Sequence, residues 1–306
     1  MNNRHHQSWP FFKANVVASI APNRALSFCA VFLISITTGS VVAQSEDGPP
    51  AWAYPVNPPD LRSAPDDGSL RHVPDSAASY TLTQVSDRFV APDWHPGDHL
   101  PMPEIVARGR KPDVFACGFC HRADGPGGPE NASLAGLPAA YIIQQVADFK
   151  SGARITSVPQ RVPPQLMISL TKGMSDAEVE AAAAYFSALK PKSLIKVVET
   201  DTVPKTYVPG WHLAAVKTGE REPIGERIIE GPEKLEDFVS RDARTHFIAY
   251  APIGSIQKGQ ALAVSGGGGK TVQCGTCHGS DLKGVGPIPG IAGHSPSYIV
   301  RQLYDI

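Results

Sequence analysis

The chain has 306 residues, 42% of them hydrophobic and 19% charged, and its 28 basic and 29 acidic residues give a formal net charge of −1 at pH 7. This balance argues against the strongly basic surface that a nucleic-acid partner requires. Four of the five cysteines fall in two short motifs, and the fifth, Cys29, lies in a segment that we expect to be removed. No thiol is therefore left for a disulfide or for a catalytic nucleophile.

Residues 1–43 have the features of a secretory signal peptide. Three basic residues, Arg4, Lys13 and Arg24, precede an apolar stretch over 25–42. Small residues end it at Ala43, the expected cleavage site. A retained membrane anchor is the alternative, but the stretch is near the lower length limit for spanning and is interrupted by polar residues. We expect cleavage and a periplasmic location. Removing the segment leaves 25 basic and 29 acidic residues, which favours partners with a basic docking patch.

Residues 44–100 are rich in proline and lack helical or strand periodicity. We expect an extended arm that wraps over the surface or is partly disordered. Trp52, Tyr54 and Trp94 are the side chains that would anchor it.

Residues 101–191 have the pattern of a compact helical domain. We expect a short helix over 104–110, a second helix that begins near Pro138 and continues to 149, and a third over 175–190. Ser175 and Glu178 form a capping box at the start of the third helix, which Pro191 ends.

The most specific signal within this domain is the motif Cys117-Gly-Phe-Cys120-His121, and a second copy follows at Cys274-Gly-Thr-Cys277-His278. Cys-x-x-Cys-His is the attachment signature of c-type haem. The two thiols form thioethers with the porphyrin, and the histidine binds the iron. A zinc ribbon would need the two cysteine pairs much closer together, and a thioredoxin-like redox pair does not require the histidine. The motifs predict two covalently attached haem c groups.

Residues 192–255 match neither motif-bearing segment. Short β-rich stretches at 195–198 and 206–208 predict an inter-domain insertion that contains a small hairpin.

From residue 256 the pattern of the first domain returns. A shift of 157 residues aligns 117–149 with 274–306 without a gap and gives 12 identities in 33 positions, several of them unrelated to haem attachment. Their recurrence predicts the same fold at both motifs. The repeat stops within an expected helix, so we expect the second domain, 256–306, to be incomplete.

These residues resemble the class I c-type cytochromes, and the tandem arrangement resembles the two-haem (dihaem) cytochromes of bacterial periplasms. The resemblance covers about 101–191 and 256–306 and rests on the two motifs, on Leu134-Ala-Gly136 and on the helix over 175–189. It implies a mainly α fold: two class I-like helical domains in tandem, with the proline-rich arm and the partly β insertion added.

A low-spin carrier needs a second axial ligand, and methionine is the usual partner of histidine in this class. Met102, Met167 and Met174 are available in domain one. Met174 directly precedes the cap Ser175, where it can pack on Val179. Met167 follows Val162-Pro163-Pro164 in what we expect to be a loop, and the resemblance places the ligand there. We favour Met167 and keep Met174 as the alternative. Domain two offers no methionine; the open choices are a ligand outside the sequence, an open iron, or His294, His246 or His212.

The expected function is electron transfer without a bound substrate, from a dehydrogenase or quinol-oxidising donor to an oxidase or reductase. Association with a membrane complex is left open. The alternative is a two-haem enzyme, peroxidase-like or an oxidoreductase acting on a small molecule, that uses an open iron in domain two. If the function is electron transfer, as expected, the chain is not an enzyme. Cys117, Cys120, Cys274 and Cys277 bind the cofactors, and His121, Met167 and His278 bind metal.

Overall fold

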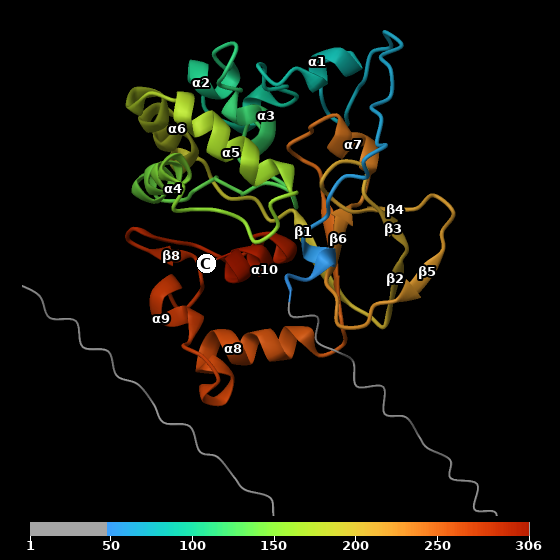
Figure 1. Ribbon diagram of the computed structural model, residues 1–306, viewed down its shortest axis with the longest axis vertical. Helices are drawn as coiled ribbons and strands as arrows, with labels where there is room; N and C mark the ends of the chain where they lie inside the picture. The colour runs from blue at the N-terminus through green and yellow to red at the C-terminus, as the bar shows by residue number, and fades with distance from the viewer. Residues whose placement is uncertain (1–47, 306) are drawn as a thin grey trace, which may run out of the picture. The chain divides into compact units, whose positions relative to one another are not determined.

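The structure is a computed structural model that describes residues 48–305, so the predicted signal peptide lies outside the described residues. The helices in this range are η1 (Ala51–Ala53), α1 (Leu82–Ser86), η2 (Pro96–Asp98), α2 (Glu104–Ala107), α3 (Cys117–His121), α4 (Ala139–Ser151), α5 (Val162–Gly173), α6 (Asp176–Ala188), α7 (Leu235–Val239), α8 (Ser255–Gly269), α9 (Cys274–His278) and α10 (Pro296–Asp305). Figure 1 shows their arrangement. Within the same range, none of these helices has both the length and the apolar character needed to cross a bilayer.

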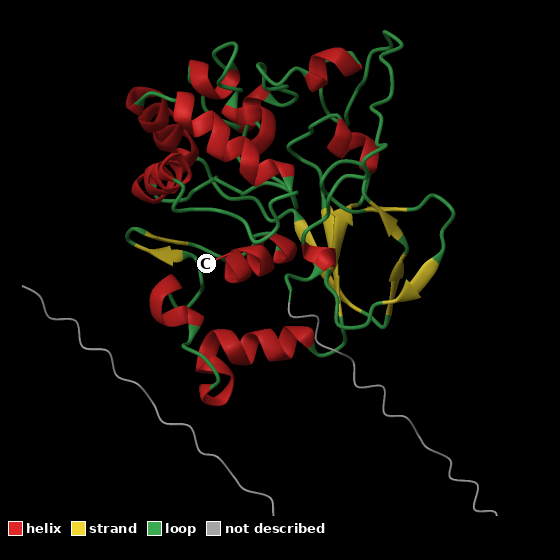
Figure 2. Ribbon diagram, in the orientation of Figure 1, coloured by secondary structure: helices red, strands yellow, loops and turns green. Residues whose placement is uncertain are grey.

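Nine short strands complete the described secondary structure, and most lie between α6 and α8 (Figure 2). They are β1 (Ile195–Glu199), β2 (Thr202–Pro204), β3 (Thr206–Tyr207), β4 (Ala214–Ala215), β5 (Arg221–Pro223), β6 (Ile229–Pro232), β7 (Phe247–Ala251), β8 (Gly284–Val285) and β9 (Ile288–Pro289).

Helices α2, α3, α4 and α6 share one apolar core. α4 and α6 pack on each other and both contribute to it, with Ile142 from α4 and Val179, Ala183 and Phe186 from α6. The predicted capping box is confirmed: Ser175 Oγ accepts from the Glu178 amide, and the Glu178 carboxylate accepts from the Ser175 amide at 2.8 Å. Met174 lies in the same core as Val179, as expected of a residue that precedes the cap.

The segment around Met167 is a helix, so the prediction of a loop is wrong. α5 begins at Val162, and the two prolines occupy its first turn. A proline there costs nothing, because the first amides of a helix have no partner within the helix. Prolines that appeared to stiffen a loop therefore start a helix of 12 residues.

The arm is mostly irregular, as expected, but it is more than an extended strap. Val73, Val85 and Trp94 form a small core of their own. Trp94 also donates from its indole nitrogen to the carbonyl of Ser240 at 2.7 Å. Tyr54 and Trp94 are both buried, and Trp52 packs on the core of the insertion, so the three predicted anchors do hold the arm.

The insertion contains more than the small hairpin predicted. Its main sheet has the order β1-β7-β6, in which β1 and β7 are parallel and β6 and β7 antiparallel. The predicted strands at 195–198 and 206–208 correspond to β1 and β3. A parallel pair needs a long connection, here the stretch from Thr200 to His246, and that pairing is not visible in the local pattern.

Candidate functional site

The two cysteine–histidine motifs form single-turn helices with the same geometry. α3 follows an extended Ala116 (φ −60°, ψ 126°), and α9 follows an extended Gln273 (φ −62°, ψ 127°). The third residue of each motif donates back to that capping residue, Phe119 to Ala116 at 3.0 Å and Thr276 to Gln273 at 3.1 Å. A helical turn brings residues three apart to the same side, so each cysteine pair faces one way.

Each motif histidine is oriented by a carbonyl 11 residues further on. His121 Nδ1 lies 2.8 Å from the Ala132 oxygen, and His278 Nδ1 lies 2.8 Å from the Pro289 oxygen. A carbonyl can only accept, so Nδ1 must carry the hydrogen, and Nε2 keeps its lone pair. This is the tautomer in which imidazole binds a metal through Nε2.

The loop between each histidine and its carbonyl also repeats, as does the backbone just after it. Gly127 and Gly284 have φ values of +66° and +94°, and Gly136 and Gly293 have +72° and +77°. A Cβ on Gly127 would lie 2.4 Å from the Ala132 oxygen. Only glycine permits this approach, because it tolerates positive φ and has no side chain. The recurring glycines in the sequence therefore mark the backbone that brings the carbonyl to the histidine.

The two sites differ in burial. His121 is buried, and desolvation lowers the pKa of its imidazole, which keeps it neutral. The loop behind it, residues 127–129, is also buried, whereas the corresponding residues 284–286 are half-buried or exposed. Burial raises the pKa of the Cys117 thiol to about 12, and Cys277 is exposed. The first site is enclosed, and the second is open among the described residues.

The donor set at each motif fits a covalently held haem. All four motif cysteines are free thiols rather than disulfides, and each pair is followed by a histidine whose Nδ1 is held by a backbone carbonyl. Two thiols and one histidine in this spacing supply both thioethers and one axial ligand.

The three methionines of domain one occupy different environments. Met174 is 8% exposed in the helical core, and Met102 packs against the same core. Met167 is half-buried on α5. Its assignment as an axial ligand stays a prediction.

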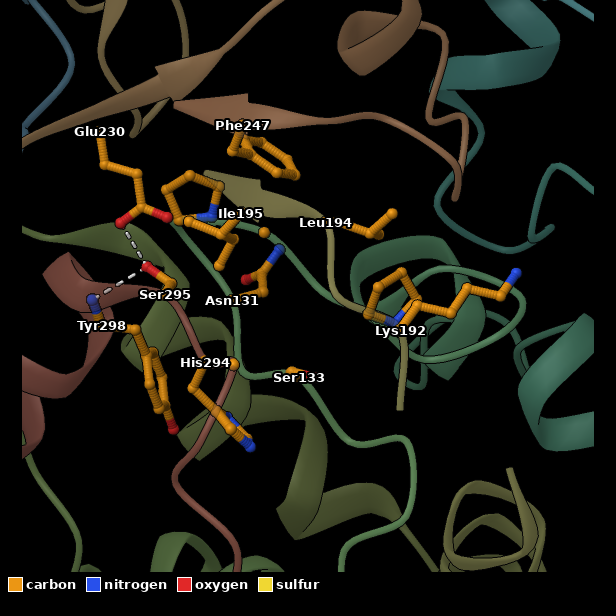
Figure 3. Close-up of a pocket in the computed structure, with 14 residues that line it drawn as sticks. Asn131, Ser133, Lys192, Leu194, Ile195, Glu230, Phe247, His294, Ser295 and Tyr298 are labelled. Carbon is orange, nitrogen blue, oxygen red and sulfur yellow. Dashed lines mark hydrogen bonds between the residues drawn. The ribbon is translucent and has the colours of Figure 1, made fainter. Parts of the chain in front are cut away.

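The three histidines considered for the second iron are also dispersed. His212 is buried in the insertion, with Nδ1 2.7 Å from the Gly210 oxygen and its ring against Phe238, and its Nε2 has no partner in the described part of the chain. His246 is exposed. His294 lines a pocket that also includes Asn131, Ser133 and Glu230 (Figure 3).

A buried arginine that sequence reasoning missed lies beside the first motif. Arg122 is 2% exposed, its guanidinium lies 5.0 Å from the centre of the Phe238 ring, and it is 3.7 Å from Glu130. Desolvation lowers the pKa of its guanidinium. No local signal identifies it, because the aromatic ring that covers it comes from the insertion more than 100 positions away.

A protein-family model matches the helical domain. The family model described as cytochrome c matches residues 106–190. Two proteins described as thiosulfate dehydrogenase electron acceptor, from Thiomonas intermedia and Stutzerimonas stutzeri, are 28% and 27% identical over 195 and 200 residues. These alignments cover 63% and 64% of this chain and the same shares of the relatives, so the chain spans less than two thirds of their length. Cytochrome c4 from Stutzerimonas stutzeri is 35% identical over 80 residues, 25% of this chain and 38% of that protein.

Proposed function

We propose that this chain is a class I c-type cytochrome, with its cytochrome c domain at residues 106–190, that carries electrons in the periplasm on two covalently bound c-type haems. One observation carries the proposal. The second motif reproduces the first in its helix, in its positive-φ glycines and in a histidine Nδ1 held by a carbonyl at 2.8 Å. The same backbone geometry supports the same cofactor at both places.

Each motif cysteine and histidine has a defined role in this proposal. Cys117 and Cys120 would hold the first haem, and Cys274 and Cys277 the second. His121 and His278 would bind the irons through Nε2, each with its ring fixed by the carbonyl behind it. A haem bound in this way supplies one-electron exchange between ferrous and ferric iron. The protein would bind the haem, orient the imidazole and keep water from the buried first site. Electron transfer of this kind needs no binding site for a substrate or a transferred proton.

The partners follow from the relatives and from the signal segment. The two relatives named as electron acceptors of thiosulfate dehydrogenase support a dehydrogenase as the electron donor. A quinol-oxidising complex is the other donor class, and an oxidase or reductase would take the electrons. The signal-like residues 1–43 support transfer in the periplasm.

Counting haems tests the proposal directly. The intact mass of the purified protein gives the number of attached haems, and we expect two. The paired variants C117S/C120S and C274S/C277S should each lose one. A wild-type protein with a single haem, unaffected by C274S/C277S, would show that the second motif does not bind the cofactor.

A two-haem enzyme with an open iron is the second candidate. It is favoured by one feature: none of the described residues 256–305 is a methionine, the usual partner of a haem histidine in this class. Carbon monoxide, which binds an open ferrous haem, separates the candidates.

A further inference from the structure

Two buried arginines contact the loop that orients the first axial histidine. Arg161, which precedes α5, is 1% exposed, and Arg301, on α10, is 4% exposed. They lie 140 residues apart in the sequence. Both donate to backbone oxygens of the loop between His121 and Ala132.

Both arginines join the same two segments of backbone. Arg161 donates to the Pro55 oxygen at 3.0 Å and to the Glu130 oxygen at 3.4 Å. Arg301 donates to the Ala53 oxygen at 2.7 Å and to the Pro129 oxygen. Neighbouring carbonyls of the arm are thus linked to neighbouring carbonyls of the loop. Hydrogen bonds from a charged donor are stronger than neutral ones and hold the loop in one position.

The helix that carries Arg301 is itself fixed in place. Glu230 of β6 is 2% exposed, and one of its carboxylate oxygens accepts from Ser295 Oγ at 2.6 Å (Figure 3). The same oxygen accepts from the Ser297 amide at 3.0 Å, at the start of α10. At the other end, Asp305 accepts from the Tyr54 hydroxyl at 2.8 Å. α10 is therefore held by the insertion and by the arm while Arg301 reaches the loop.

The internal repeat shows that Arg301 is specific to the second copy. The shift of 157 residues pairs it with Gln144 of α4, which is exposed and bonds to Asp148 of its own helix. In the second copy, the loop equivalent to 127–132 is the hairpin β8–β9, and no described arginine donates to its carbonyls.

We propose that Arg301, together with Arg161, is a positioning residue for His121: it holds the loop that carries the Ala132 carbonyl and so sets the hydrogen bond to His121 Nδ1. This inference rests on the proposed role of His121 as an axial ligand. It makes α10, the arm and the insertion a brace for the first haem. The second haem has no such brace among the described residues.

Hydrogen exchange on the holoprotein tests the brace. Arg301→Gln introduces the residue of the first copy, and Arg301→Lys keeps the charge but not the forked guanidinium. We expect the Gly128 and Asn131 amides, which bond across this loop, to exchange about tenfold faster in both variants. Peptides over 283–290 in the same molecule should not change. Arg227→Gln is the matched control, because Arg227 donates to the Ile224 and Pro223 carbonyls far from the loop.

The reduction potentials give a second readout. A weaker hydrogen bond to Nδ1 makes the imidazole a poorer electron donor to iron, so Arg301→Lys should raise the potential of the first haem and leave the second unchanged. Wild-type exchange in both variants would overturn the proposal, and so would a change in Arg301→Gln alone, which would indicate an effect of charge. If Arg301→Gln does not fold, Arg301→Lys decides. Haem content is counted first, so a failure of the proposed function is seen separately.

Discussion

His121 donates its Nδ1 hydrogen to the Ala132 carbonyl at 2.8 Å, 11 residues further along the chain. The same spacing and distance recur between His278 and Pro289. A histidine within a haem motif is common, but its orientation depends on the loop that brings the acceptor back. In this chain that loop depends on a glycine whose missing side chain leaves room for the carbonyl.

The substitution Gly127→Ala should disturb this hydrogen bond. Its Cβ would meet the Ala132 oxygen at 2.4 Å in a backbone with φ +66°, and we expect a loss of about 3 kcal/mol or more in the free energy of unfolding. Gly152→Ala is the control, because Gly152 has φ +80° but nothing within 4 Å of an added Cβ. It should lose only about 1–2 kcal/mol. Denaturant unfolding measures both, and equal losses would show that the contact with Ala132 is unimportant.

Replacement of the two methionines tests the distal ligand. Met167→Leu should lower the potential of the first haem and open its iron to carbon monoxide, because a thioether ligand favours ferrous iron. Met174→Leu should leave both properties unchanged and cost about 1 kcal/mol of stability or less, since it conserves volume in the core. A potentiometric titration of each variant gives the answer. The opposite pattern would assign the ligand to Met174.

Glu178 should contribute an acid-dependent part of the stability. Hydrogen bonds from Arg110 and from the Ser175 amide lower the pKa of its carboxyl from 4.5 to about 2. A lowered pKa in the folded state stabilises the protein above the unfolded pKa, and the contribution is lost as pH falls from about 4.5 to about 2. Arg110 is half exposed, so we expect about 1 kcal/mol after screening.

Glu178→Gln isolates that charge, because glutamine at this position can still complete the capping box. The variant should be less stable than wild type at pH 7, and the two should converge near pH 2. Unfolding curves across this range measure the difference. A difference that does not depend on pH would assign the effect to packing.

Local chemistry made part of this structure predictable. The two motifs and the capping box at Ser175 each lie within a short stretch of sequence, and the repeat is found by aligning two such stretches 157 residues apart. The family match at 106–190 and the geometry of α3, α6 and α9 agree with these predictions. The misassigned loop at Met167 has a local cause as well, since prolines suit both a loop and the first turn of a helix.

The remainder depends on contacts between distant residues. Arg301 bonds to Ala53 across 248 positions and to Pro129 across 172, and no window of sequence contains both partners. The sequence pattern of the arm is weak, so it predicts only an extended arm over the surface or partial disorder. Its order comes from partners such as Ser240, the acceptor for Trp94.

Carbon monoxide uptake by the reduced protein separates the carrier from the enzyme. A carrier holds each iron on both sides, so we expect no uptake by the wild-type protein. Met167→Leu should then take up carbon monoxide at one haem of the two, because only the first iron loses its predicted ligand. Uptake at one haem of the wild-type protein would contradict the carrier and favour the enzyme with an open second iron. If the wild type takes up none, His294→Ala is the variant to measure first for the second ligand, since His294 lies two residues before α10, and a gain of uptake in it would identify the ligand.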